Sequence, residues 1–102
     1  MEMRIGHGYD LHCLEASEQD GGLLKVGGID VKCGLKAIAH SDGDVVMHAL
    51  ADALLSAIGE PDIGQLFPDT ATENKNRDSA EFLVEAIERI NLGGWAIGNV
   101  AI

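Results

Sequence analysis

The stretch AHSDGDVVMHALADALLSAIG, residues 39–59, contains the clearest helical pattern of the chain and its densest group of reactive side chains. From about Asp44 to Ile58 apolar residues recur at helical spacing, which predicts an amphipathic helix that ends at Gly59 and Pro61. Its expected apolar face consists of Val45, Val46, Ala49, Leu50, Ala53, Leu54, Ala57 and Ile58. A polar stripe, Asp44, His48 and Asp52, runs along the same segment. By default such a stripe is the solvated face of the helix.

A second amphipathic helix is predicted to begin near Asp78–Ser79, with Glu81 placed as in a capping box, and to end at Gly93–Gly94. Its expected core face consists of Phe82, Leu83, Ala86, Ile87 and Ile90. Residues 62–76 between the two helices are irregular by composition.

Strand patterns precede the first helix. Residues 3–14 alternate, with Ile5, Tyr9 and Leu11 on the expected packing side and Gly6, Gly8, Asp10 and His12 on the polar side. Residues 23–26 and 29–32, separated by Gly27–Gly28, predict a β-hairpin. Residues 15–22 and 33–44 have loop composition, and residues 95–102 are typical of a strand that begins at the end of the chain, which suggests a fragment of a longer domain.

Composition limits the possible functions. The 102 residues make one domain, 1–102, with a formal net charge of -10 and no cluster of Lys or Arg, which argues against nucleic-acid binding. An anionic ligand would therefore need metal ions. Cys13 and Cys33 form no CxxC pair, which favours a reducing compartment. There is no signal-peptide pattern and no membrane-spanning apolar run, so we expect a cytoplasmic protein or one whose targeting peptide was removed.

One group of residues has the character of a metal site. Asp10 and His12 lie two residues apart on an expected strand, so both side chains leave the same face. With His48 they would be the two-histidine, one-carboxylate set that leaves one position of a zinc ion open. Spacing alone does not select the third ligand, and an Asp-x-His pair is more often just hydrogen-bonded.

A second group lies at the start of the first helix. His40 and Ser41 could hold a phosphate against unpaired backbone N–H groups. Alternatively, Ser41 or Asp42 is simply the N-cap and Asp42–Gly43 the turn. Asp62, Ile63 and Gly64 could bind hydroxyls of a small polyol or merely form a turn.

Together these segments resemble one family. RIGHGYDLH at 4–12, the turn at 27–28, AHSDGDVVMHALADALL at 39–55, DIGQLFPDT at 62–70 and GNV at 98–100 have the order and spacing of the 2-C-methyl-D-erythritol 2,4-cyclodiphosphate synthases. The resemblance implies that Asp10, His12 and His48 bind zinc and that His40 and Ser41 contact a diphosphate. It also implies that Asp62 and Gly64, with Ile63 between them, hold erythritol hydroxyls, that Phe67 and Asp69 shape the pocket, and that Asp52 has a lesser role.

The family reaction implied is that of a phosphorus–oxygen lyase in non-mevalonate isoprenoid biosynthesis. It cyclises 4-diphosphocytidyl-2-C-methyl-D-erythritol 2-phosphate to 2-C-methyl-D-erythritol 2,4-cyclodiphosphate and releases cytidine monophosphate (CMP). Zinc, one ion per subunit, would act with a second divalent ion, magnesium or manganese.

The resemblance also implies an architecture: a single α/β domain with a mixed β-sheet covered by helices on one side, assembled as a homotrimer, in the bacterial cytoplasm or the plastid stroma. Family members continue for roughly half as many residues again, and that part supplies the cytidine pocket and a magnesium-binding glutamate. We therefore expect this chain to be C-terminally truncated, with an incomplete sheet. Two alternatives stay open: an inactive zinc-binding fragment of the family, and a metallohydrolase that uses the same three ligands.

Overall fold

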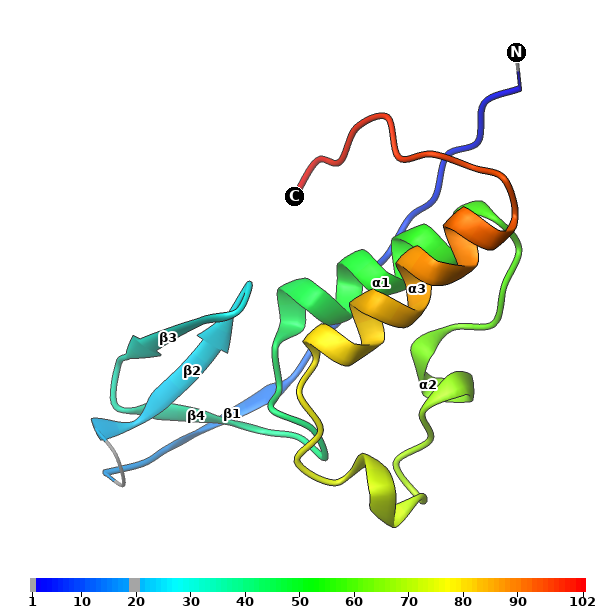
Figure 1. Cartoon of the computed structure of the whole chain (residues 1–102). Helices are drawn as coiled ribbons and strands as arrows, with labels where there is room; N and C mark the ends of the chain where they lie inside the picture. Colours follow the sequence, from blue (N-terminus) through cyan, green and yellow to red (C-terminus); the bar gives the residue numbers. More distant parts are fainter. Residues whose placement is uncertain (1, 19–20) are drawn as a thin grey trace.

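The structure is a computed structural model that describes residues 2–18 and 21–102 (Figure 1). Its elements in chain order are β1 (Cys13–Ala16), β2 (Leu23–Val26), β3 (Ile29–Lys32), β4 (Leu35–Ile38), α1 (Val45–Ala57), α2 (Ile63–Leu66), the 3-10 helix η2 (Thr72–Asn74) and α3 (Ala80–Leu92). The expected α/β class is confirmed. Two antiparallel ladders, β1–β4 and β2–β3, lie beside one end of the packed helices α1 and α3. Within the described ranges there is no parallel pair, so no mixed sheet forms there.

The core lies between α1 and α3, and the face of α3 predicted from the helical periodicity forms part of it. In α1 the predicted face is wrong in part: of the expected residues only Leu54 is buried, whereas Ala51 and Leu55 are fully buried and were not expected. The buried apolar residues of the core are Ala51, Leu54, Leu55, Phe82, Ala86 and Ile90. Leu83 and Ile87, which we expected in the same face of α3, are only partly buried and pack on its border. Because both helices present apolar residues at three- and four-residue intervals, they bury these faces against each other.

The β2–β3 hairpin forms with the predicted bounds, and its register places Val26 opposite Ile29. Gly27 and Gly28 both have positive φ angles, 60° and 84°, as the two central residues of the tightest hairpin turn require. Their N–H groups donate to the carboxylate of Asp44, over 2.9 Å and 2.6 Å. One side chain thus joins the hairpin to the start of α1.

Asp44 is also the N-cap of α1, because it accepts a hydrogen bond from the N–H of Met47 over 3.1 Å. The expectation that Ser41 or Asp42 caps this helix is therefore wrong. The carboxylate of Asp42 is instead occupied by the N–H of Asp44 and by Ser79. Asp44 is fully buried and His48 is 6% exposed, so the polar stripe is not a solvated face either.

Residues 4–11 are extended but form no strand, because a strand needs a ladder partner and none of the described residues supplies one. The segment lies directly on α1: a Cβ on Gly6 or Gly8 would lie 1.8 Å from the carbonyl oxygen of Ala53 or Ala49. Only glycine permits such an approach. The expected packing face is instead open, with Ile5 89% and Tyr9 71% exposed.

Other local predictions were also wrong. β4 lies within a segment expected to be a loop, and β1 begins in the alternating segment 3–14 but continues to Ala16, within a segment also expected to be a loop. Composition does not reveal these strands, because their pairing, Cys13 opposite Ile38, joins residues far apart in sequence. Part of the loop expected at 15–22, residues 19–20, lies outside the described residues. Residues 95–102 are not a strand, since no neighbouring strand pairs with them among the described residues.

The segment between the long helices is more regular than its composition indicates, since it holds α2 and η2. Ser79 precedes α3 but makes no capping hydrogen bond with its side chain, so the capping box is not formed. The Oδ1 atom of Asp78 accepts from the N–H of Ala80 instead. The hydroxyl of Ser79 donates to Asp42 and lies against Nε2 of His48.

The two cysteines, Cys13 and Cys33, are free and exposed. None of the helices found in residues 2–18 and 21–102 has the length and apolarity to cross a bilayer.

We expect Asp44→Ala to lower the free energy of unfolding by about 3 kcal/mol, because it removes an N-cap and leaves three N–H groups without their acceptor. Urea denaturation followed by circular dichroism measures this change. Asp44→Asn is the matched control: it keeps one acceptor oxygen and should cost less. Equal losses in the two variants would contradict the assignment.

Candidate metal centre and its cavity

A cavity of about 360 Å³ is lined by residues of the N-terminal segment, the β4–α1 connection, α1, α2 and α3. Every site residue singled out from the sequence lines it: Asp10, His12, His40, Ser41, His48, Asp52, Asp62, Ile63, Gly64, Phe67 and Asp69. Ile38, Ala39, Asn74 and Phe82 complete the lining. The structure thus brings together residues from distant parts of the chain, while the role of each stays a prediction.

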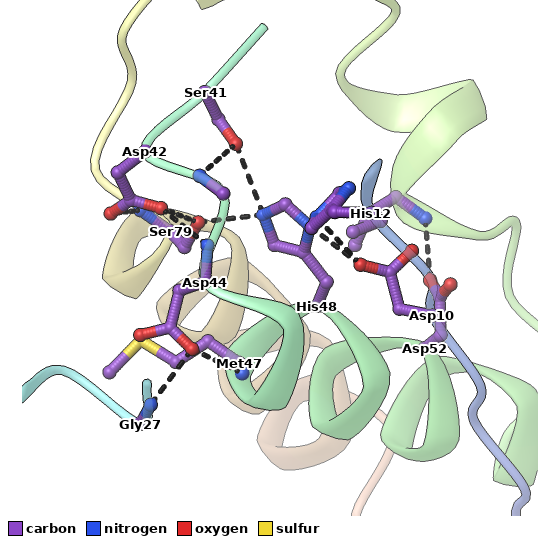
Figure 2. A network of polar contacts seen from close by, with 12 residues as sticks. Asp10, His12, Gly27, Ser41, Asp42, Asp44, Met47, His48, Asp52 and Ser79 are labelled. Carbon is purple, nitrogen blue, oxygen red and sulfur yellow. Dashed lines mark hydrogen bonds and ion pairs between the residues drawn. The ribbon is translucent and has the colours of Figure 1, made fainter. Parts of the chain in front are cut away.

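Asp10, His12 and His48 converge at one wall of this cavity (Figure 2). Oδ2 of Asp10 lies 2.9 Å from Nε2 of His12 and 3.1 Å from Nδ1 of His48. The two histidine nitrogens are themselves 3.1 Å apart. The three side chains thus present one ligand atom each to a common point.

This geometry fits a zinc ion. In a tetrahedral site with bonds of 2.0–2.1 Å, neighbouring ligand atoms lie roughly 3.3 Å apart, close to the separations seen here. Two imidazoles and one carboxylate are ligand types that zinc and other first-row divalent metals accept. The cavity beside them leaves room for a further ligand.

Local structure explains how these atoms meet. Asp10 and His12 are two residues apart in an extended segment, so both side chains point to the same side, toward α1. His48 lies in the first turns of α1, whose start is held by the cap at Asp44. His7, in the same extended segment, is exposed and not part of the group.

The charge of the cavity is strongly one-sided. Its lining includes the carboxylates of Asp10, Asp52, Asp62 and Asp69 but no Lys or Arg among the described residues. A phosphorylated ligand would therefore be repelled unless metal ions neutralised the site. The acidic charge balance of the whole chain is thus repeated in the lining of this cavity.

Asp52 lies one turn of α1 beyond His48 and joins the cavity to α2. Its Oδ1 atom accepts from the N–H of Ile63 over 2.8 Å. Burial raises the pKa of Asp52, an effect partly offset by that hydrogen bond and reinforced by the neighbouring charges of Asp62 and Asp10. Asp62 caps α2 by accepting from the N–H of Gln65 over 2.9 Å.

His40, which lines the cavity, is hydrogen-bonded to the loop that follows α2. Its Nε2 atom lies 3.3 Å from the carbonyl oxygen of Ala71, and its own carbonyl accepts from the N–H of Asn76 over 2.7 Å. Asn74 is buried and donates from its amide to the carbonyl of Pro68 over 2.8 Å. These bonds hold the loop against the cavity.

The other ring nitrogen of His48 points away from the metal site. Nε2 lies 2.6 Å from Oγ of Ser79 and 3.2 Å from Oγ of Ser41. The hydroxyl of Ser79 donates to Oδ1 of Asp42, and the N–H of Ser79 donates to Oδ2 over 2.9 Å. Burial alone would raise the pKa of Asp42, but the hydrogen bonds from Ser79 and Asp44 hold that pKa below its ordinary value of 3.8.

An aromatic wall completes the surroundings of His48. Its ring centroid lies 5.2 Å from that of Phe82, which in turn lies 4.7 Å from that of Phe67. The sequence predicted Phe67 in the pocket through the family resemblance, and Phe82 only as a core residue.

Sequence reasoning missed Asn74, Phe82, and the pair Asp42 and Ser79 as neighbours of the site. Asp42 and Ser79 were each assigned a local capping role, because both are common N-cap residues. Their true partners lie more than thirty positions away in sequence, where a local pattern carries no signal.

Comparisons with known proteins agree on one family. The sequence profile of the YgbB family matches residues 3–102. The 2-C-methyl-D-erythritol 2,4-cyclodiphosphate synthase of Rhodopirellula baltica is 51% identical over 100 residues, which are 98% of this chain. The chloroplastic synthase of Oryza sativa subsp. japonica is 45% identical over 98% of this chain.

A solved structure of a 2C-methyl-D-erythritol-2,4-cyclodiphosphate synthase, described as the bound form with CDP, superimposes with a TM-score of 0.78. It is 47% identical in sequence and aligns with 89% of this chain. The present chain covers 58% of that structure, 58% of the Rhodopirellula baltica protein and 43% of the Oryza sativa protein. It thus spans little more than half of the bacterial relative that it matches.

The lowered pKa of Asp42 leads to a prediction on pH. A carboxyl whose folded-state pKa lies below its unfolded value adds stability above the unfolded value, and that stability is lost as the pH falls through the folded pKa. We expect Asp42→Asn to lower the free energy of unfolding at neutral pH. The difference from the wild type should shrink as the pH falls below 3.8.

Urea denaturation between pH 2.5 and about 7, a range that brackets the ordinary carboxyl pKa, measures this difference. A difference that stays constant over the range would show that Asp42 contributes through packing instead of charge.

Proposed function

The chain belongs to the YgbB family, and on that premise we propose that it provides the zinc-binding side of a cyclodiphosphate synthase active site. In this proposal Asp10, His12 and His48 hold one zinc ion per subunit. The substrate is 4-diphosphocytidyl-2-C-methyl-D-erythritol 2-phosphate and the products are 2-C-methyl-D-erythritol 2,4-cyclodiphosphate and CMP. The enzyme would be a phosphorus–oxygen lyase of non-mevalonate isoprenoid biosynthesis.

One observation carries the proposal: three ligand atoms of Asp10, His12 and His48 lie within 4.8 Å of one another on the wall of a cavity. Relatives at 45–51% identity are known as 2-C-methyl-D-erythritol 2,4-cyclodiphosphate synthases, a name that supplies the substrate class. The acidic lining supports the need for metal, because a substrate with several phosphate charges meets four carboxylates there and no Lys or Arg among the described residues.

The reaction proposed is an intramolecular phosphoryl transfer. An oxygen of the 2-phosphate attacks the β-phosphorus, a new P–O bond closes the ring, and the bond from that phosphorus to the bridging oxygen breaks. The bridging oxygen leaves with the α-phosphate as CMP. Because the attacking phosphate oxygen is already ionised near neutral pH, no general base is needed, and positioning with charge stabilisation carries the step.

The chain's own residues would do the positioning. In this proposal His40 and Ser41, which lie between β4 and α1 and line the cavity, contact the diphosphate. The carbonyl of Ala71 orients the His40 ring. Asp62 and Gly64 lie at the exposed start of α2, where they can bind hydroxyls of the erythritol. A bound zinc ion would supply Lewis-acid polarisation of a phosphoryl oxygen.

Ile63, Phe67, Asp69 and Asp52 are assigned to the pocket wall in the same proposal. The N–H of Ile63 already donates to Asp52, so Ile63 contributes its side chain and Asp52 supports α2. Magnesium or manganese, bound with the substrate, would neutralise the remaining phosphate charge.

We further propose a homotrimer located in a bacterial cytoplasm or a plastid stroma. The open face of the N-terminal segment supports assembly, because Ile5, Tyr9 and Leu11 are all more than 70% exposed. A chloroplastic relative supports the plastid alternative. No membrane or nucleic-acid partner is proposed.

A second candidate is a zinc-binding fragment of the family without turnover. It is favoured by the coverage, since the chain spans 58% of the Rhodopirellula baltica protein. A metallohydrolase that uses the same three ligands would instead release inorganic phosphate or an uncyclised product.

Zinc binding gives the first test. With zinc at 100 times its dissociation constant, we expect thermal unfolding to show about 2.7 kcal/mol of added stability, which EDTA removes. Asp10→Asn, His12→Ala and His48→Ala should each lose this stabilisation. His7→Ala is the matched control, because His7 is an exposed histidine in the same segment and should leave the zinc effect intact. If His7→Ala lost it as well, the assigned ligands would be wrong.

Release of CMP separates the three candidates. The purified protein, with its mass verified and with zinc and magnesium supplied, is incubated with the diphosphocytidyl substrate and the products are identified by mass spectrometry. The cyclase predicts CMP together with the cyclic diphosphate, and the metallohydrolase predicts a hydrolysed, linear product. Zinc binding without release of CMP would support the fragment and contradict the cyclase.

A further inference from the structure

Behind the candidate metal ligands lies a hydrogen-bonded chain of three side chains, Asp42, Ser79 and His48 (Figure 2). The three come from different elements: the β4–α1 connection, the residue before α3, and α1. Ser79 is fully buried and His48 is 6% exposed, so water does not compete for their contact. None of the roles proposed above uses Asp42 or Ser79.

The protons of this chain can be assigned in order. The carboxylate of Asp42 has no proton to give, because hydrogen bonds from Ser79 and Asp44 keep its pKa low despite burial. It therefore only accepts, and it receives the one hydroxyl proton of Ser79. The Ser79 oxygen is then left with lone pairs alone for its contact with His48.

His48 must consequently be the donor in that contact. Its Nε2 atom lies 2.6 Å from Oγ of Ser79, a distance at which one of the two atoms carries the shared proton. Because the Ser79 proton is already given to Asp42, Nε2 of His48 carries it. A neutral imidazole protonated at Nε2 has its lone pair at Nδ1.

Nδ1 is the atom that faces Asp10 and His12, 3.1 Å from Oδ2 of Asp10 and 3.1 Å from Nε2 of His12. A histidine binds a metal only through an unprotonated nitrogen, and its other N–H commonly donates to a partner that sets the orientation of the ring. His48 has this arrangement, because its Nδ1 atom faces Asp10 and His12 and its Nε2 atom contacts Ser79.

We propose that Ser79, polarised by Asp42, is a positioning residue that holds His48 in the Nε2–H tautomer and directs Nδ1 to the metal. Ser41 is a weaker partner of the same atom, because its Oγ lies 3.2 Å from Nε2 and accepts from the N–H of Gly43 over 3.3 Å. Ser79 acts only through His48 and does not line the cavity. The inference rests on the metal site proposed above.

The test compares the zinc affinity of the wild type with that of Ser79→Ala, by competition with a chromophoric chelator. We expect Ser79→Ala to bind zinc 10–100-fold more weakly, the usual effect of removing a partner that orients a ligand histidine. Ser79→Thr is the matched control: it keeps the hydroxyl and should bind within about threefold of the wild type, because threonine retains the acceptor oxygen.

A spectroscopic measurement reads the tautomer itself. Long-range proton–nitrogen correlation spectra of the zinc-loaded, ¹⁵N-labelled wild type should show His48 with a protonated Nε2 and a coordinating Nδ1. In Ser79→Ala the Nε2–H signal should broaden or exchange with solvent, since its acceptor is gone. A general loss of packing would change many signals and would not affect the Nε2–H signal of His48 alone. If Ser79→Ala fails to fold, Ser79→Cys replaces it, because its thiol keeps the volume but accepts hydrogen bonds weakly.

Asp42→Asn tests the far end of the chain of hydrogen bonds. Its amide can donate to Oγ of Ser79, which would free the Ser79 proton for Nε2 and favour the wrong tautomer of His48. We expect weaker zinc binding and a smaller fraction of the Nε2–H form, with Ser79 unchanged. Zinc affinity and tautomer both equal to those of the wild type would overturn the role of Asp42.

The outcomes separate this inference from the proposed function. If the wild type binds no zinc, the proposed metal site fails first and the inference with it. Should the wild type bind zinc and Ser79→Ala match it in affinity and spectrum, only the positioning role is overturned. Equal losses in Ser79→Thr and Ser79→Ala would also overturn it, because the hydroxyl would not be the cause.

Discussion

The buried carboxylate of Asp44 is the interaction on which the arrangement of this chain depends most. It accepts the two N–H groups of the hairpin turn and caps the first turn of α1, so the β2–β3 hairpin and α1 share one anchor. Fixing the first turn of α1 also fixes the direction of His48, one turn later. A charged group completely out of water is tolerated because three donors surround it.

The close approach of the N-terminal segment to α1 is a second constraint on the candidate site. Gly6 and Gly8 let the N-terminal segment lie against the carbonyl oxygens of the helix, and His7 adds a hydrogen bond from its N–H to Oγ of Ser56 over 3.0 Å. Asp10 and His12 follow in the same segment and reach His48. Backbone packing therefore sets the relative positions of the three candidate ligands, and such preorganisation is what a metal site requires.

Polar groups in this protein are placed so that one side chain serves both fold and site. Asp52 supports α2 while it lines the cavity, and Asp62 caps α2 at the cavity's exposed edge. His48 packs on Phe82 in the core while its ring nitrogens face Asp10 and Ser79. Such double use means that substitutions here change stability and binding together, and that conservative variants are needed to tell the two apart.

The sequence by itself determined the elements whose signals are local: the bounds of α1 and α3 within one or two residues, the hairpin at Gly27–Gly28, and, through the family resemblance, the residues that meet at one cavity. These follow from helical periodicity, from glycine conformation and from motif order. Only the tertiary structure decided that residues 13–16 and 35–38 pair, that Asp44 caps α1, and that the Asp42–Ser79 pair supports His48. Each of these depends on partners at least fifteen positions apart, or on competition between nearby acceptors for the same N–H groups, and a local pattern contains no information on either.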